Sequence, residues 1–150
     1  MIPKKYLFTN RFATAVLSLS LVAIATPNPF MQGGKGVAFA QPNGSPILQE
    51  EGVLEEGDTV LEEDGSLYDI YTFEGSAGQS VVIAAESSDF DTYVLVADSE
   101  GNILGENDDI SEEDTNSRLE VTLPSDGTYN AIVNGFEASD RGSYILTISE

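Results

Sequence analysis

The stretch RLEVTLPSDGTYNAIV, residues 118–133, contains the plainest strand pattern in the chain. Leu119, Val121 and Leu123 alternate with polar residues, so an extended backbone would place the apolar side chains on one face and the polar ones on the other. Segment 124–127, Pro-Ser-Asp-Gly, has the composition of a turn, and a second apolar run follows it. The stretch therefore predicts two short strands separated by a turn, the first of which has one face for a core.

Similar patterns recur from this stretch toward both ends of the domain. Short runs rich in β-branched and aromatic residues alternate with turns containing Gly, Ser, Asp or Asn, and no segment shows a helical stripe of useful length. Strands are predicted at 67–73, 80–86, 92–97, 103–104, 118–123, 129–133 and 143–148, after two shorter extended pieces at 53–58 and 60–65. The predicted fold class is all-β, an antiparallel β-sandwich or jelly roll of about eight strands.

The first 40 residues are predicted to be a secretory signal peptide. Three basic residues among the first eleven precede a charge-free apolar run at 12–25, which is shorter than the roughly 20 residues that a bilayer span requires. Small residues permit cleavage after Ala25 or Ala40, and Ala40 is favoured because the earlier site lies inside the apolar run. Export to the periplasm or to the medium is therefore predicted, with an uncleaved N-terminal anchor as the alternative.

Three segments follow from these boundaries: a signal peptide at 1–40, a flexible linker at 41–51 and the β-sandwich domain at 52–150. The linker is predicted because its segment contains two prolines and an Asn-Gly pair and shows little apolar periodicity.

Cleavage after Ala40 would leave a strongly acidic chain. All 26 acidic residues follow residue 40, against two basic ones, Arg118 and Arg141, so the formal net charge becomes −24. Such a polyanion repels nucleic acid and anionic lipid headgroups, which makes nucleic-acid binding the least favoured function. The chain has no cysteine, so an exported domain must rely on its core or on a bound metal rather than on disulfides.

The residue inventory also restricts catalysis. The chain has no His and no Cys, and its three lysines all precede residue 41, so Ser-His, Cys-His and Ser-Lys arrangements are excluded from the mature chain. Paired carboxylates can serve a glycosidase, which leaves a small carboxylate-dependent hydrolase as an alternative. The prediction is that the protein is not an enzyme.

Seven short motifs occur in an order that resembles the bacterial pre-peptidase C-terminal domain, over roughly residues 52–150. They are Asp69-Ile-Tyr71-Thr-Phe73, Ala77-Gly78-Gln79, Asp89-Phe-Asp91, Val94 to Asp98 with Gly101, Asn107-Asp108-Asp109, Leu123-Pro-Ser-Asp-Gly127-Thr-Tyr129 and Gly142-Ser-Tyr144-Ile-Leu-Thr-Ile148. The resemblance implies a β-sandwich accessory module of exported enzymes, similar in fold to the collagen-binding domains of collagenases. In the usual arrangement a catalytic domain precedes the module, whereas here a signal sequence and a short arm do.

Acidic clusters make calcium a candidate cofactor, because this ion takes 6–8 oxygen ligands and tolerates irregular geometry. Asp89 and Asp91 alternate, so both would project to the same side of an extended segment. The resemblance to collagen-binding domains implies that linker acids join end-loop acids at such a site. The tentative calcium ligands are Glu62, Glu63, Asp64, Asp89, Asp91, Asn107, Asp108 and Asp109. The alternative is a solvated acidic rim that keeps the domain soluble.

The function predicted from the sequence is a secreted, noncatalytic binding or accessory module with calcium as its candidate stabiliser. Its partner would be an extracellular or envelope protein or polymer, with no nucleic acid and no stable membrane span after signal cleavage. A structural or export accessory domain without a specific ligand is the first alternative, and the carboxylate-dependent hydrolase is the second.

Overall fold

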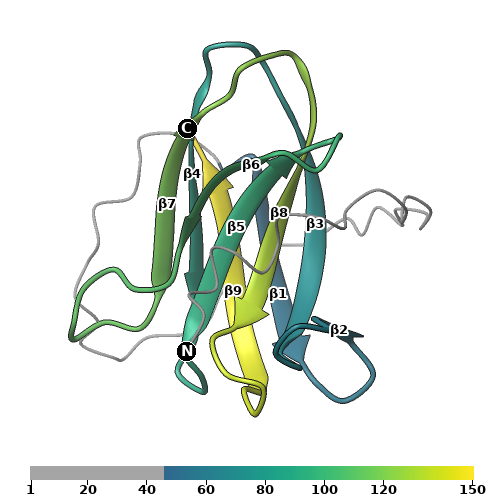
Figure 1. Cartoon of the computed structure of the whole chain (residues 1–150). Coiled ribbons are helices and arrows are strands. Elements are labelled where there is room, and N and C mark those ends of the chain that lie inside the picture. The colour runs from purple at the N-terminus through teal and green to yellow at the C-terminus, as the bar shows by residue number, and fades with distance from the viewer. Residues whose placement is uncertain (1–45) are drawn as a thin grey trace, which may run out of the picture.

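The structure, a computed structural model, describes residues 46–150 of the chain (Figure 1). This part contains nine β-strands. They are β1 (Leu48–Leu54), β2 (Thr59–Val60), β3 (Leu67–Gly75), β4 (Ser80–Glu86), β5 (Thr92–Asp98), β6 (Ile103–Asn107), β7 (Ser117–Thr122), β8 (Gly127–Gly135) and β9 (Gly142–Ser149). The predicted signal peptide and both cleavage sites fall within residues 1–45, outside the described residues. Within 46–150 no helix is long and apolar enough to cross a membrane.

The strands form two sheets that pack face to face. The four-stranded sheet has the order β1-β9-β4-β7 and the five-stranded sheet the order β2-β3-β8-β5-β6. Every strand pair in both sheets is antiparallel. The predicted antiparallel β-sandwich is confirmed.

The stretch that opened the sequence analysis forms β7 and β8, as predicted. The two strands do not pair with each other, because β7 lies at the edge of the four-stranded sheet and β8 near the middle of the five-stranded one. The turn between them therefore carries the chain from one sheet to the other, a connection typical of sandwiches. Turn composition alone cannot distinguish such a crossing from a hairpin.

The domain begins earlier than the sequence indicated. Strand β1 starts at Leu48 and pairs with β9 from Leu48 opposite Ile148 to Leu54 opposite Gly142. Residues 48–51 therefore belong to the sandwich and not to the predicted flexible linker at 41–51. Period-two alternation is hard to see there because Gly52 and glutamates occupy most of the strand between the two leucines.

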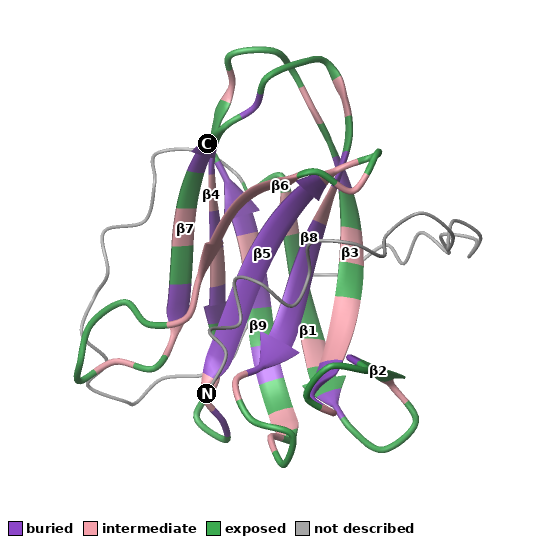
Figure 2. Ribbon diagram, in the orientation of Figure 1, coloured by how far each residue is buried: buried purple, intermediate pink, exposed green. Residues whose placement is uncertain are grey.

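The core fills the space between the sheets (Figure 2). Inward-facing residues such as Ile83, Val94, Leu146 and Ile148 are completely buried, because alternate positions along each strand face the opposite sheet. The rings of Phe73 and Tyr129 stack with their centroids 5.7 Å apart. This core supplies the stability that the chain cannot obtain from disulfides.

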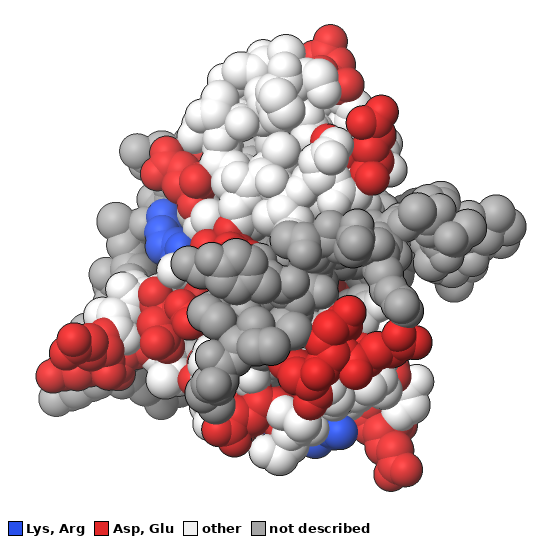
Figure 3. All heavy atoms as spheres, viewed as in Figure 1, with Lys and Arg blue, Asp and Glu red and all other residues white. Residues whose placement is uncertain are grey.

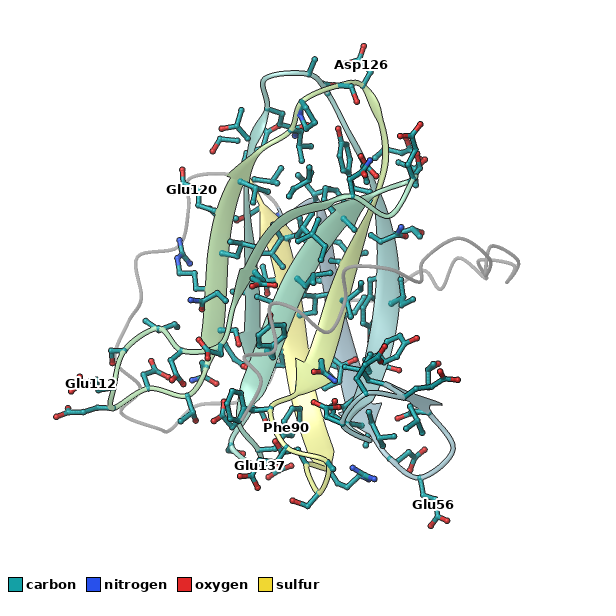
Figure 4. All side chains as sticks on the ribbon, viewed as in Figure 1. Glu56, Phe90, Glu112, Glu120, Asp126 and Glu137 are labelled. Carbon is teal, nitrogen blue, oxygen red and sulfur yellow. The ribbon has the colours of Figure 1, made fainter. Side chains whose placement is uncertain are left out.

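Five connections lie at the same end of the sandwich: β1–β2, β2–β3, β4–β5, β6–β7 and β8–β9 (Figure 1). We call this end the acidic end. Figure 4 shows Glu112, Phe90, Glu137 and Glu56 there, with the Glu112 side chain pointing away from the protein. The connections β3–β4, β5–β6 and β7–β8 lie at the opposite end, where Figure 4 labels Asp126.

Candidate binding surface

All eight candidate calcium ligands lie at the acidic end (Figure 1). Glu62, Glu63 and Asp64 lie between β2 and β3, Asp89 and Asp91 between β4 and β5, and Asn107 at the end of β6 with Asp108 and Asp109 after it. The structure thus places the three acidic clusters at one end of the sandwich. Side chains that lie at the same end do not thereby coordinate calcium, because coordination requires several oxygen atoms that converge on one point.

Several of these side chains are used by the protein itself. One oxygen of Asp64 accepts hydrogen bonds from the amide of Ser66, at 2.9 Å, and from its hydroxyl, at 2.6 Å. One oxygen of Asp89 accepts the amide of Ser143 at 3.0 Å, which ties the β4–β5 connection to β9. The side-chain oxygen of Asn107 accepts the amide of Arg118 at 3.0 Å. Each bond organises a turn or joins two strands.

The described residues do not fit a ready-made calcium site. Within 46–150 no group of three or more acidic side chains is arranged to hold a metal ion. Glu62, Glu63 and Asp109 are exposed and Asp91 is half-buried. This arrangement favours the solvated acidic rim, and calcium binding by these residues stays a prediction.

A metal titration separates the two possibilities. We expect millimolar calcium to change the melting temperature no more than the same concentration of magnesium does, because a diffuse rim screens both ions alike. Thermal unfolding of the protein, stripped with chelator and then titrated with each salt, measures this. A larger rise with calcium that disappears in Asp89→Asn would instead establish a specific site.

A hydrogen-bonded network links the two sheets beside β1, and no sequence pattern indicates it beyond the alternation of Asp69 and Tyr71. The hydroxyl of Tyr144, on β9, donates to an Asp69 carboxylate oxygen on β3 at 2.6 Å. The hydroxyls of Tyr71 and Tyr144 are hydrogen-bonded at 2.7 Å, and their rings meet edge to face. The three polar side chains therefore join β3 to β9 across the side of the sandwich.

The pKa values of all three members of this network are raised, chiefly by burial. Partial burial raises the pKa of Asp69 above its ordinary value, the Tyr144 hydrogen bond offsets part of this, and the charge of Asp58 adds to it. Burial also raises the pKa of Tyr144, and the hydrogen bond to Asp69 raises it further. Both phenols therefore stay protonated at neutral pH and serve as donors.

The raised pKa of Asp69 gives a pH dependence with a definite sign. A carboxyl whose pKa is higher folded than unfolded contributes stability that is present below the unfolded value, near 3.8, and is lost as pH rises through the folded value. We therefore expect Asp69→Asn to gain stability relative to the wild type as pH rises from 4 toward 7. Urea unfolding of both proteins across this range measures the difference, and a difference that is flat or falls with pH would contradict it.

A second apolar cluster lies on the face of the five-stranded sheet that points away from the core. We call it the outer cluster: Leu61, Tyr93, Leu95, Ala97 and Ile132, with Tyr68 and Ile103 packed against it. Side chains alternate along β5, so Tyr93, Leu95 and Ala97 lie in the outer cluster, whereas Val94 and Val96 belong to the core between the sheets. The sequence predicted β5 but not its second apolar face, since a continuous apolar run has no visible alternation.

Acidic side chains greatly outnumber basic ones on the face that Figure 3 shows. Residues 46–150 contain all 26 acidic residues of the chain against Arg118 and Arg141. That part contains no His, Cys or Lys, so it carries none of the usual nucleophile–base pairs. Its chemistry suits recognition of a positively charged surface.

Comparison with known proteins supports the class that this fold and surface define, a β-sandwich accessory module. Residues 67–135, β3 through β8, match the family model of the bacterial pre-peptidase C-terminal domain. This match agrees with the resemblance that the motifs indicated, and the matched family is one of noncatalytic accessory domains. No curated protein is significantly similar to the chain in sequence.

Two solved structures share the fold. The pre-peptidase C-terminal domain of collagenase from Bacillus anthracis is 15% identical with a TM-score of 0.53, and the alignment covers 69% of this chain and 90% of that one. Aeromonas hydrophila PliG, a periplasmic inhibitor of g-type lysozyme, is 20% identical with a TM-score of 0.50, with 75% and 91% covered. At such identities the likeness concerns the fold.

Proposed function

We propose that the protein is an exported, noncatalytic β-sandwich module that binds a protein partner in the periplasm or outside the cell. The observation that carries the proposal is the residue inventory of an accessory-family sandwich: 26 acidic residues, two arginines and no His, Cys or Lys within 46–150. Such an inventory favours binding over nucleophilic or acid–base chemistry built on His, Cys or Lys. It also favours a partner of opposite charge.

The choice of a protein partner has a second support. PliG, which shares the fold, is an inhibitor of an enzyme, g-type lysozyme, so a sandwich of this architecture can serve as a protein-binding unit. A polymer is the second candidate for the partner, since another protein of this fold is a domain of a collagenase. An export or structural accessory without a ligand remains a third candidate.

Binding to defined probes tests the proposal. The protein purified after export is immobilised, and g-type lysozyme, hen egg-white lysozyme, type I collagen and peptidoglycan are passed over it at about 0.15 M NaCl. We expect saturable binding of at least one basic protein, above that to an acidic control protein of unrelated fold. Binding of the polymers alone would favour a polymer partner, and no binding at all would favour the accessory without a ligand.

The hydrolase alternative is tested with the same preparation. We expect no turnover of a panel of glycan and peptide substrates, because most carboxylates of the acidic end lie in connections exposed to solvent, whereas a glycosidase pair lies in a substrate cleft. Turnover abolished by replacing one carboxylate would overturn the noncatalytic assignment.

A further inference from the structure

Most of strand β3 forms an open edge of the five-stranded sheet. Strand β2 pairs with β3 only at Leu67 and Tyr68, and within residues 46–150 no other strand pairs with β3 on that side. Figure 1 shows the short β2 beside one end of β3 only. Residues 69–75 of β3 are therefore an edge without a neighbouring strand in the described part of the chain.

Hydrogen bonds on both sides of β3 establish which backbone groups point outward. The amide of Leu61 donates to the Ser66 carbonyl oxygen at 2.8 Å, which places this carbonyl on the β2 side. The side-chain amide of Asn134, on β8, donates to the Leu67 carbonyl oxygen at 2.7 Å, which places that carbonyl on the opposite side. Alternate residues of an antiparallel strand direct both backbone groups to the same neighbour. Even-numbered positions of β3 therefore point to the β2 side and odd-numbered ones to β8.

Ile70, Thr72 and Glu74 are the even-numbered positions of β3 that β2 does not reach. Their backbone amides and carbonyls point to the open edge, where no strand of residues 46–150 pairs with them. All three residues are exposed in the structure, Ile70 by 43%, so no part of the chain has to be removed to reach them. A row of such edge groups is a template for a further strand, as in β-strand addition.

Other edges of the sandwich are less suited to a further strand. At the opposite edge of the same sheet β6 lies against β7, since a Cβ atom at Gly105 would come within 3.0 Å of the Val121 side chain and 3.1 Å of that of Leu119. Edge strand β1 has two glutamates and a glycine at its centre, which disfavour strand pairing. Residues 70–73 of β3, Ile-Tyr-Thr-Phe, are β-branched or aromatic at every position and favour it.

Charge decides which strand fits this edge. Asp69 and Glu74 lie near the two ends of the open stretch, and β1, β2 and β3 contain no Lys or Arg. The pKa of Tyr71 is raised chiefly by burial, and the nearby charges of Asp69, Glu50 and Asp58 add to this, so these carboxylates surround the same edge. A second copy would bring like charges together and is disfavoured, whereas a basic strand is attracted.

We propose that residues 69–75 of β3 dock an extended basic segment of the partner protein, which adds to the five-stranded sheet beside β3 and in line with β2. The inference rests on the proposed function and adds to it the docking site and the backbone conformation of the partner. Backbone hydrogen bonds to Ile70, Thr72 and Glu74 supply the pairing, and Lys or Arg side chains of the segment meet the surrounding carboxylates.

Amide exchange followed by NMR tests the edge directly. The probes are two acetylated heptapeptides, one that alternates lysine with valine and one that alternates glutamate with valine. We expect the lysine peptide, in excess at about 0.15 M NaCl, to slow exchange at the amides of Ile70, Thr72 and Glu74 by about tenfold. The amides of Tyr71 and Phe73, which face β8, should change by less than about twofold. The glutamate peptide should protect none of them.

Two variants at one position provide the matched comparison. Thr72→Pro removes an outward-facing amide, and proline is tolerated in an edge strand where that amide faces solvent, whereas Thr72→Val keeps the amide. We expect Thr72→Pro to weaken binding of the lysine peptide, and of the basic protein that the probe panel identifies, by about tenfold. Thr72→Val should leave both within about twofold. If circular dichroism shows that Thr72→Pro is unfolded, amide exchange in the wild type decides.

The outcomes separate the docking edge from the proposed function. No protection of the three amides, or equal protection by both peptides, would overturn the docking edge. A panel protein that binds a folded Thr72→Pro as tightly as the wild type would also overturn it and leave the proposed function intact. A panel in which no basic protein binds would overturn the proposed function, and the peptide would still decide the edge. Protection that rises with protein concentration in the absence of peptide would identify a second copy as the occupant and overturn the basic segment.

Discussion

Replacing Gly52 by Ala is expected to destabilise the protein by about 3 kcal/mol, because overpacking here would also disturb the Tyr71–Tyr144–Asp69 network. Strand β1 passes so close to the network that a Cβ atom at Gly52 would overlap the ring of Tyr144 and lie 2.7 Å from the Tyr71 hydroxyl. The rings cannot withdraw freely, since Tyr144 packs edge to face on Phe90 with centroids 6.2 Å apart. Chemical unfolding measures the loss.

The neighbouring residue supplies the control. Val53 points outward from the same strand and is 48% exposed, so Val53→Ala should cost less than about 1 kcal/mol. The double variant Gly52→Ala with Tyr144→Val should be less destabilised than the sum of its single variants, because the shorter side chain removes the overlap. Additive losses would show that the close approach to Tyr144 is not the cause.

The strand pattern was predictable because local chemistry determines it. Segments 80–86, 92–97 and 143–148 combine β-branched or aromatic residues with glycine- or serine-containing turns, and each became a strand with bounds shifted by at most one residue. Strand β1 was missed in part because glycine and glutamate, both depleted in strands, fill its centre. Its strand character comes from pairing with β9, which is a long-range property.

The candidate sites were likewise predictable only where local sequence determines them. That Asp89 and Asp91 lie at one end of a sandwich follows from strand order, but whether carboxylates converge depends on distances between connections remote in sequence. The partner of Asp69 is a tyrosine 75 residues away, and no local pattern announces it. The outer cluster was hidden for a different reason, since residues 93–97 are apolar at every position and give no indication of which residue faces which side.

The hydrogen bonds and the charge of the acidic residues can now be considered together. The acidic residues that looked like metal ligands use part of their hydrogen-bonding capacity within the protein: Asp64 bonds to Ser66 in its own turn, and Asp89 bonds to Ser143 on β9. The remaining charge acts collectively, as a negative field around the domain. The proposed recognition of a basic partner would use this field and would not require a bound ion.

The second large effect is expected from Thr92→Val, which should cost about 2 kcal/mol although it keeps the shape of the side chain. The buried Thr92 hydroxyl contacts the Ala85 carbonyl oxygen at 3.1 Å and the Ser117 hydroxyl at 2.8 Å, which links β4, β5 and β7. Ser117 in turn donates to the carbonyl oxygen of Asp108 at 2.9 Å, where the acidic β6–β7 connection begins.

Valine would leave buried oxygens short of a partner and loosen that connection, so amide hydrogen exchange at residues 109–116 should rise along with the loss of stability. Thr72→Val, on an exposed position of β3, makes the same chemical change and should alter stability by less than about 0.5 kcal/mol. If Thr92→Val unfolds at the wild-type urea concentration with unchanged exchange in the connection, the hydroxyl pair does not hold the acidic connection in place. If exchange rises only there, the bond from Ser117 is the link that couples the core to the acidic end.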